Sequence, residues 1–171
     1  MENSKELIIK YFFNEHLKVK EIAEIIHTSS SYITKIIKLD KRYLEEKEIP
    51  YKDFGTYDEE TLDDPEAIKD ACRCIQNKKC DVGIFISGSG FGMAMFANKF
   101  KGIRSVDCFN EDGAKRAKAH YNANVLAIPA EFVSLDTAIN IIRGWLGTDV
   151  LGGRYQERME VIKEIEKENM K

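Results

Sequence analysis

The ten residues "IFISGSGFGM", Ile84 to Met93, decide the fold of this chain. Their apolar beginning predicts a buried strand, and the "MAMFANKF" segment that follows predicts a helix. Gly88, Gly90 and Gly92 alternate with other residues between the two, which predicts a tight strand-to-helix turn. The backbone amides of such a turn can hold an anion or a developing negative charge, and Ser89 can add a hydroxyl. Glycines required only for a tight turn explain the pattern equally well.

The spacing of these glycines argues against two common phosphate-binding motifs. The pattern is G-x-G-x-G, whereas dinucleotide binding requires G-x-G-x-x-G. Met93-Ala94 occupies the place of the Lys-Ser/Thr pair that a P-loop requires. The open alternatives are therefore an amide nest for a small anion and a purely structural turn.

Strands and helices alternate on both sides of this turn. Strands are predicted for "YKDFGTY", "IRSVDCF" and "NANVLAIP". Helices are predicted to begin near Asp64-Pro65, at Asn110 and at Ser134, where each start carries a residue typical of a helix N-terminus. Apolar strands that alternate with helices predict an α/β fold, with a parallel sheet covered on both faces, over residues 50–171.

Residues 1–49 follow a purely helical pattern. Apolar residues at helical spacing, a polar break at residues 27–30 and the small Ala23 predict an N-terminal trihelical helix-turn-helix unit. Nine Lys/Arg against nine Asp/Glu leave this unit neutral, so a helical packing or dimerisation module is as plausible as DNA binding. The side chains suited to DNA bases and phosphates on its second helix are Ser31, Tyr32, Lys35 and Lys38.

Composition excludes several classes of function. A net charge of -3 gives the chain no overall attraction for nucleic acid. Four cysteines show neither a secreted disulfide pattern nor a paired metal motif, which favours reduced thiols, a cytoplasmic location and no metal. Membrane spans need about 18 consecutive apolar residues, and the sequence has no such run, so no membrane partner is predicted.

Two further cues lie outside the glycine turn. Arg154 and Arg158 are four residues apart on a predicted helix, so they share a face and can converge on one anion. His120 stands where a helix gives way to a strand, and the neighbouring Asn122 and Asn124 permit a polar pocket. Taken separately, both cues also fit an ordinary protein surface.

Taken together, these segments resemble the family of type B ribose-5-phosphate isomerases and galactose-6-phosphate isomerases. "DFGTY", "GIFISGSGFGMAMFANKFKGIRSV", "AHYNANVLA" and "GGRYQERMEVI" follow that family's order and spacing, across about residues 52–166. The resemblance implies a Rossmann-like three-layer domain and a homodimer, or higher homo-oligomer, with active sites between subunits. It also implies aldose–ketose isomerisation of a phosphorylated sugar through an enediolate, without a metal or other cofactor.

The resemblance assigns roles to the residues singled out above. The nest for the enediolate oxygen would be formed by Gly88, Gly90 and Gly92, with the Ser89 hydroxyl. His120 would assist ring opening, and Asn98 would line the pocket. Arg154 and Arg158 would bind the phosphate, serving the site of a partner subunit.

This chain departs from the family at the catalytic base. Ser87 stands where the family commonly has a cysteine, and Met93 where some relatives have a glutamate. A serine hydroxyl is far less acidic than a thiol of pKa roughly 8.5, so Ser87 would itself need a base. Tyr121 replaces an asparagine, and the family's first strand with its Asp-His turn has no counterpart, so the sheet is predicted to lack one strand.

The sequence therefore leaves alternatives. One is a sugar-phosphate isomerase with an unusual base. Another is a non-catalytic, sugar-phosphate-sensing regulator that binds DNA through the helix-turn-helix unit. A third is a relic that has neither activity.

Overall fold

A computed structural model of the chain describes residues 49–54 and 65–170. The helix-turn-helix unit predicted over residues 1–49, with its four DNA-contact candidates, lies outside the described residues except for its last position. Residues 51–54 form neither helix nor strand, so the strand predicted from "YKDFGTY" is wrong for the described part of that segment. A strand requires a pairing partner for its backbone, and the strands of the described sheet pair only with one another.

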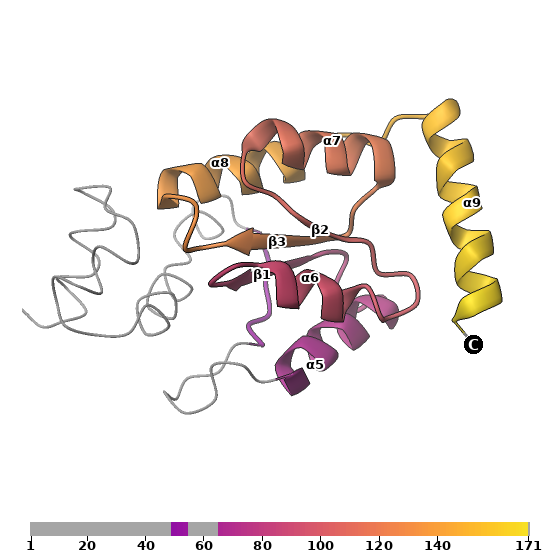
Figure 1. The fold of residues 1–171 in the computed structure, drawn as a ribbon, viewed down its shortest axis with the longest axis horizontal. Coiled ribbons are helices and arrows are strands. Elements are labelled where there is room, and N and C mark those ends of the chain that lie inside the picture. Colours follow the sequence, from indigo (N-terminus) through magenta and orange to yellow (C-terminus); the bar gives the residue numbers. More distant parts are fainter. Residues whose placement is uncertain (1–48, 55–64, 171) are drawn as a thin grey trace, which may run out of the picture.

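The described sheet has three parallel strands in the order β1-β3-β2 (Figure 1). They are β1 (Gly83–Ser87), β2 (Ser105–Asp107) and β3 (Val125–Pro129). Every residue of the central strand β3 is buried, as expected of a parallel strand covered on both faces.

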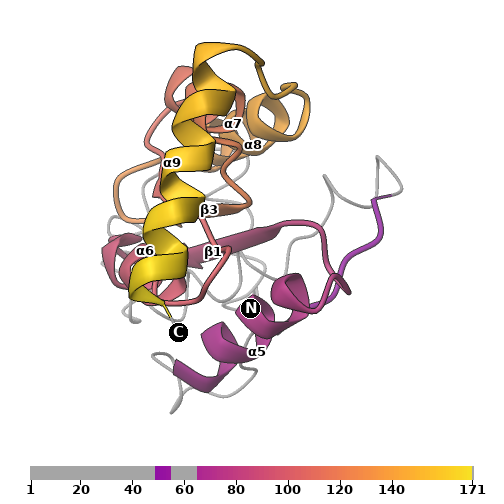
Figure 2. The same ribbon diagram turned by 90° about the vertical axis from the view of Figure 1, so that its right-hand side faces the viewer.

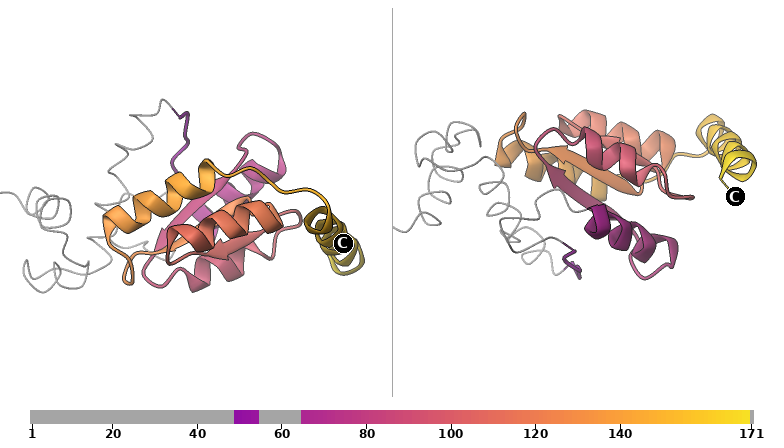
Figure 3. Two further views of the ribbon diagram at one scale, coloured as in Figure 1. Left: turned by 90° about the horizontal axis from the view of Figure 1, so that it is seen from above. Right: turned by 60° about the horizontal axis from the view of Figure 1, so that its bottom comes forward.

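Helices cover both faces of this sheet, as Figures 1 and 3 show. One face carries α7 (Glu111–Tyr121) and α8 (Leu135–Leu146), and the other carries α5 (Pro65–Gln76) and α6 (Phe91–Ala97). The prediction of an α/β fold with a helix-covered parallel sheet is confirmed. No helix among the described residues is long and apolar enough to cross a membrane.

Each face of the sheet packs against its own apolar cluster. Leu126 and Ile128 point from β3 toward α7 and α8, where Trp145 and Ile141 are completely buried. Val125 points the opposite way, toward the cluster beneath α5 and α6. Successive residues of a strand face opposite sides, so one apolar strand supplies both cores.

The helix starts predicted from the sequence are formed. The side chain of Asn110 accepts a hydrogen bond from the amide of Gly113 at 2.8 Å, and that of Ser134 accepts one from Thr137 at 3.2 Å. Helix α5 begins at the predicted proline. These local signals fix where α5, α7 and α8 start, and hence where the loops of the sheet lie.

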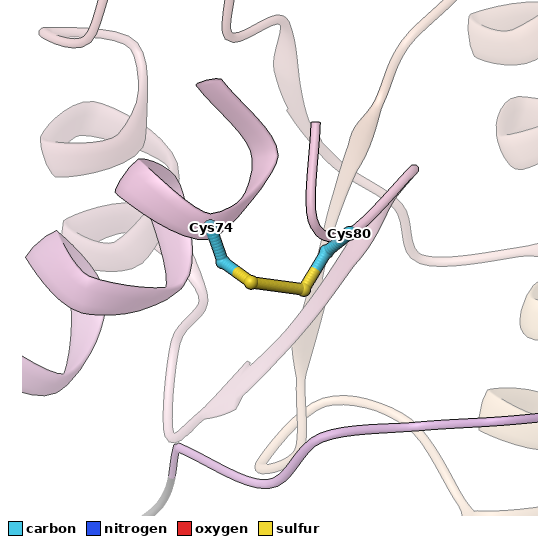
Figure 4. The surroundings of a disulfide bond; sticks show 2 residues. All are labelled: Cys74 and Cys80. Carbon is cyan, nitrogen blue, oxygen red and sulfur yellow. A yellow bond between two sulfur atoms is a disulfide. The ribbon is translucent and has the colours of Figure 1, made fainter. Parts of the chain in front are cut away.

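The cysteine pairing differs from the prediction. Cys74 and Cys80 form a disulfide (Figure 4), whereas Cys72 and Cys108 are free and buried. The turn after α5 brings the pair together, because the amide of Cys80 donates to the carbonyl of Cys74 at 3.2 Å. Spacing along the chain did not reveal this turn, so the prediction of four reduced thiols is wrong for this pair.

Candidate active site

The glycine turn lies at the carboxyl edge of the sheet, the edge where the three strands end. Strand β1 ends at Ser87 and α6 begins at Phe91, so the predicted strand–turn–helix is confirmed. Gly90 adopts a positive φ of 80°, which favours glycine. Its amide donates to the Ser87 hydroxyl oxygen at 3.1 Å. Ser87 is therefore hydrogen-bonded within the turn, and the Gly90 amide is already occupied.

Two carboxylates flank this turn, and sequence reasoning assigned a role to neither. A Cβ placed on Gly88 would lie 2.6 Å from Glu131 Oε1, and one placed on Gly90 would collide with Asp107 Oδ1. Glu131 is exposed, whereas Asp107 Oδ1 is buried without a hydrogen-bond partner. Burial raises the pKa of Asp107 above its ordinary value. The available signal was an acidic residue between the apolar Val106 and Cys108 in "IRSVDCF".

Substituting Gly90 with alanine is expected to destabilise the fold by about 1–3 kcal/mol, because a non-glycine residue at positive φ is strained. The new methyl group would also meet Asp107 and lie 3.4 Å from the backbone nitrogen of Pro129. Gly92→Ala is the matched control, since a Cβ there has nothing within 4 Å. Chemical denaturation should separate the two variants, and equal midpoints would contradict this account of the turn.

The free thiols are poor candidates for the missing base. Burial raises the pKa of Cys72 and of Cys108 to about 11, and the charge of Asp107 adds to the shift at Cys108. A thiol with such a pKa is almost entirely protonated at neutral pH, so neither cysteine supplies a thiolate.

A second cluster of functional side chains gathers around Tyr155. The His120 ring stacks on the Tyr155 ring, with centroids 4.3 Å apart and planes inclined by 13°. The guanidinium carbons of Arg154 and Arg158 lie 4.9 and 5.7 Å from the centre of the same ring. Arg154 also donates to the Tyr155 hydroxyl at 2.9 Å. We call these four residues the histidine–arginine cluster.

The structure thus brings together three residues that the sequence analysis selected from separate segments. Sequence reasoning missed Tyr155, the side chain that they share. Its only signal was its position between the two arginines, at the start of α9 (Arg154–Asn169). An aromatic ring beneath two cations and against an imidazole fixes their positions while leaving the arginines exposed.

Helix α9 places this cluster at the amino edge of the sheet, where the strands begin. The segment before α9 is tied to the end of α7, because the amide of Leu151 donates to the carbonyl of Ala119 at 2.9 Å. Near its other end, Glu166 accepts from the amide of Gly102, in the loop before β2, at 3.0 Å. Figure 2 shows α9 running across this end of the layers, from α7 toward α6.

Within one chain, the glycine turn and the histidine–arginine cluster are therefore on opposite edges. Strand β3 separates them, and five residues of parallel strand span about 16 Å. The turn follows the carboxyl end of β1, whereas His120 ends the helix that leads back to the start of β3. A single small sugar phosphate cannot contact both groups of the same chain.

Asn98, the remaining predicted binding residue, has a structural role. Its side-chain amide donates to the carbonyl of Ser105, and its side-chain oxygen accepts from the amide of Ser105, both at 2.8 Å. These two bonds join the end of α6 to the beginning of β2, at the amino edge. A role in sugar binding stays a prediction for this residue.

Comparison with known proteins identifies the family. Residues 29–162 match the family model described as Ribose/Galactose Isomerase. The chain belongs to the ribose/galactose isomerase family. The matched region begins inside the segment for which the sequence predicted a helix-turn-helix unit.

Individual relatives within this family agree in sequence and in fold. Ribose-5-phosphate isomerase B of Escherichia coli (strain K12) is 37% identical over 124 residues, which cover 72% of this chain and 83% of that protein. The solved structure of Clostridium thermocellum ribose-5-phosphate isomerase B has a TM-score of 0.73 at 35% identity and covers 77% of this chain and 88% of that chain.

A further relative was solved with a ligand. The crystal structure of ribose-5-phosphate isomerase B from Mycoplasma genitalium contains bound ribulose-5-phosphate. It matches with a TM-score of 0.71 at 34% identity and covers 77% of this chain and 88% of that chain. These comparisons support the isomerase interpretation and give no support to the DNA-binding regulator.

Proposed function

We propose that this protein is an aldose–ketose isomerase for a phosphorylated sugar such as ribose 5-phosphate, with each active site built from two copies of the chain. The observation that carries the proposal is the placement of the glycine turn and the histidine–arginine cluster on opposite edges of one sheet. A second copy can bring its own cluster to the turn of the first. The family relatives named for ribose 5-phosphate support the substrate class.

The histidine–arginine cluster supplies binding and ring opening in this proposal. A phosphate dianion carries permanent charge, and guanidinium groups bind it through paired hydrogen bonds. Arg154 and Arg158 are exposed and held around one ring, so they present a ready cationic site. His120, stacked on that ring, can move a proton between the ring oxygen and the first hydroxyl of the sugar, because a neutral imidazole has one nitrogen that donates a proton and one that accepts a proton.

The glycine turn supplies the chemical step. Isomerisation passes through an enediolate, whose negative charge develops only as the reaction proceeds. Amide groups of Gly88, Ser89 and Gly92 that face this charge would stabilise it without reorganising, and the Ser89 hydroxyl adds a donor. The two charges of the reaction, one permanent and one transient, are thus assigned to different edges of the sheet and to different chains.

Sugar phosphates of this class are intracellular metabolites, so we place the protein in the cytoplasm. The Cys74–Cys80 disulfide is unusual for that compartment. It closes a turn beyond α5 and contains no residue assigned to the site, so the proposed reaction does not depend on it.

The proposal is tested by assaying the wild-type protein with ribose 5-phosphate and, in parallel, with galactose 6-phosphate. We expect ribulose 5-phosphate to form in the first assay. The variant Ser87→Cys should increase turnover, because a thiol at this position can become a base. Binding of ribose 5-phosphate by calorimetry without any turnover would overturn the enzyme assignment while leaving the sugar-phosphate site intact.

A further inference from the structure

Asp107 has a carboxylate for which the described fold provides no partner. It is the last residue of β2, its Oδ1 is enclosed, and no hydrogen bond reaches that atom. The residue as a whole keeps part of its surface exposed. An unpaired acceptor in such a place costs stability and therefore needs an explanation, and a catalytic role is one such explanation.

The register of the sheet brings this carboxylate to the glycine turn. Asp107 pairs with Ala127, and Ser87 pairs with Pro129, so both side chains point to the α6 face of the sheet at its carboxyl edge. Ser87 accepts a hydrogen bond from the Gly90 amide, and Asp107 Oδ1 packs against the Cα side of the same glycine. A carboxylate therefore stands close to the position where the family commonly carries its basic cysteine.

The other groups near the turn are weaker candidates for moving a proton. The Cys108 thiol is buried with a pKa of about 11, and Ser87 has only a hydroxyl. Glu131 is exposed to solvent on the Gly88 side of the turn. A general base works best when its pKa lies near the operating pH, and burial moves the pKa of Asp107 in that direction. Burial alone causes this shift, with no contribution from a neighbouring charge.

We propose that Asp107 is the catalytic base, accepting the proton from C2 of the phosphorylated aldose and returning it to C1. This inference rests on the proposed isomerase function and goes beyond it by naming the group that compensates for Ser87. The same carboxylate serves in both directions, because isomerisation neither consumes nor releases a proton overall.

The step balances in atoms and charge. The Asp107 carboxylate takes the C2 proton, the C–H electron pair forms the C1=C2 bond, and the carbonyl pair of C1 moves onto its oxygen. The hydroxyl proton of O2 then passes to O1, with the Ser89 hydroxyl as the relay. As the electron pair left on O2 forms C2=O2, the C1=C2 pair takes the proton back from the Asp107 carboxyl to C1. One negative charge moves from the carboxylate to the enediolate and back, beside the amides of the turn.

The test measures turnover, binding and solvent exchange for Asp107→Asn. We expect kcat/KM for ribose 5-phosphate to fall by about 10²–10⁴-fold, the range typical for loss of a general base. Deuterium incorporation at C1 in D2O should fall in parallel, while the dissociation constant for ribose 5-phosphate stays near the wild-type value. The melting temperature should be equal or higher, because the substitution removes a buried charge. If the Asp107→Asn variant does not fold, Asp107→Ser is used instead.

Stability at different pH values gives a second, independent readout. A carboxyl group whose pKa is raised by folding binds protons more readily in the folded protein, so its ionisation destabilises the fold as the pH rises through that pKa. The stability advantage of Asp107→Asn over wild type should therefore shrink on acidification. If the stability advantage of Asp107→Asn grew on acidification, the result would contradict the account of Asp107 as an unpaired, buried carboxylate.

The control is Asp149→Asn, which removes an exposed carboxylate from the loop between α8 and α9 and should change none of these quantities. If adding Ser87→Cys to the Asp107→Asn variant restores turnover, the result would support the inference that Asp107 takes the place of a base at position 87. Full turnover in Asp107→Asn, or loss of turnover in Glu131→Gln instead, would overturn the inference and leave the proposed function standing. A wild-type protein without turnover would overturn the proposed function, and this inference with it.

Discussion

Replacing Arg154 or Arg158 with alanine is expected to raise the Michaelis constant for ribose 5-phosphate by about 10- to 100-fold, the usual cost of losing hydrogen bonds to a charged group. The guanidinium carbons of Arg154 and Arg158 lie 4.9 and 5.7 Å from the centre of the same Tyr155 ring. Each presents several donors in a planar fork that matches phosphate oxygens. The double variant should raise the Michaelis constant more than either single variant does.

The split between kcat and KM is the informative part of this result. The phosphate does not react, so its contacts are the same in the ground state and in the transition state. Removing such a contact raises KM and changes kcat much less. Loss of kcat with an unchanged KM would contradict the phosphate-binding role and place the arginines at the reacting carbons instead.

The matched control for both variants is Arg116→Ala. Arg116 is exposed on α7, so its removal takes away the same charge from the surface without touching the histidine–arginine cluster. We expect its KM to equal that of the wild type. An equal rise in KM in this control would show that overall charge, rather than a built phosphate site, attracts the substrate. Titration with salt would then weaken binding in all variants alike.

Local signals in the sequence are sufficient to predict much of the fold. The apolar run before Ser87 and the glycines after it predict a strand, a turn and a helix, and the structure contains each in that order. Asn110 and Ser134 were recognised as helix caps because capping depends on residues only three positions apart. The resemblance to the isomerase family supplied the function, since it combined four segments that are individually ambiguous.

Features that depend on distant segments were missed for a physical reason. Asp107 meets the glycine turn only because β2 pairs with β3 in a particular register, which no pattern along the chain reveals. Tyr155 joins His120 to the arginines only because the loop before α9 returns to the end of α7. The strand predicted over "YKDFGTY" is absent from its described part because strand composition does not provide a neighbouring strand with which to pair.

The position of the histidine–arginine cluster has the largest consequence for function. In a sheet of parallel strands, every strand-to-helix turn lies at one edge and every helix-to-strand junction at the other. Gly90 belongs to the first edge and His120 to the second. A site that uses both the glycine turn and the histidine–arginine cluster must combine two chains. In a symmetric dimer, each chain then contributes its turn to one site and its cluster to the other.

The most direct test of this claim uses dimers that combine two defective chains. One chain carries Gly92→Asp, which places a carboxylate at an open position in the first turn of α6, directly after the glycine turn, where it would repel the enediolate. The other carries Arg154→Ala and Arg158→Ala together. A homodimer of either variant chain should lose at least about 10²-fold in kcat/KM, because each of its two sites lacks either a functional glycine turn or a functional histidine–arginine cluster.

Mixed dimers are obtained by co-expressing the two chains with different tags and purifying on both. One of their sites combines both defects, and the other combines the two intact halves. We predict that the mixed dimer recovers about half of the wild-type turnover per dimer, as a symmetric two-site assembly requires. A mixed dimer as inactive as its parents, or a wild-type protein fully active as a monomer, would contradict a site shared between two chains.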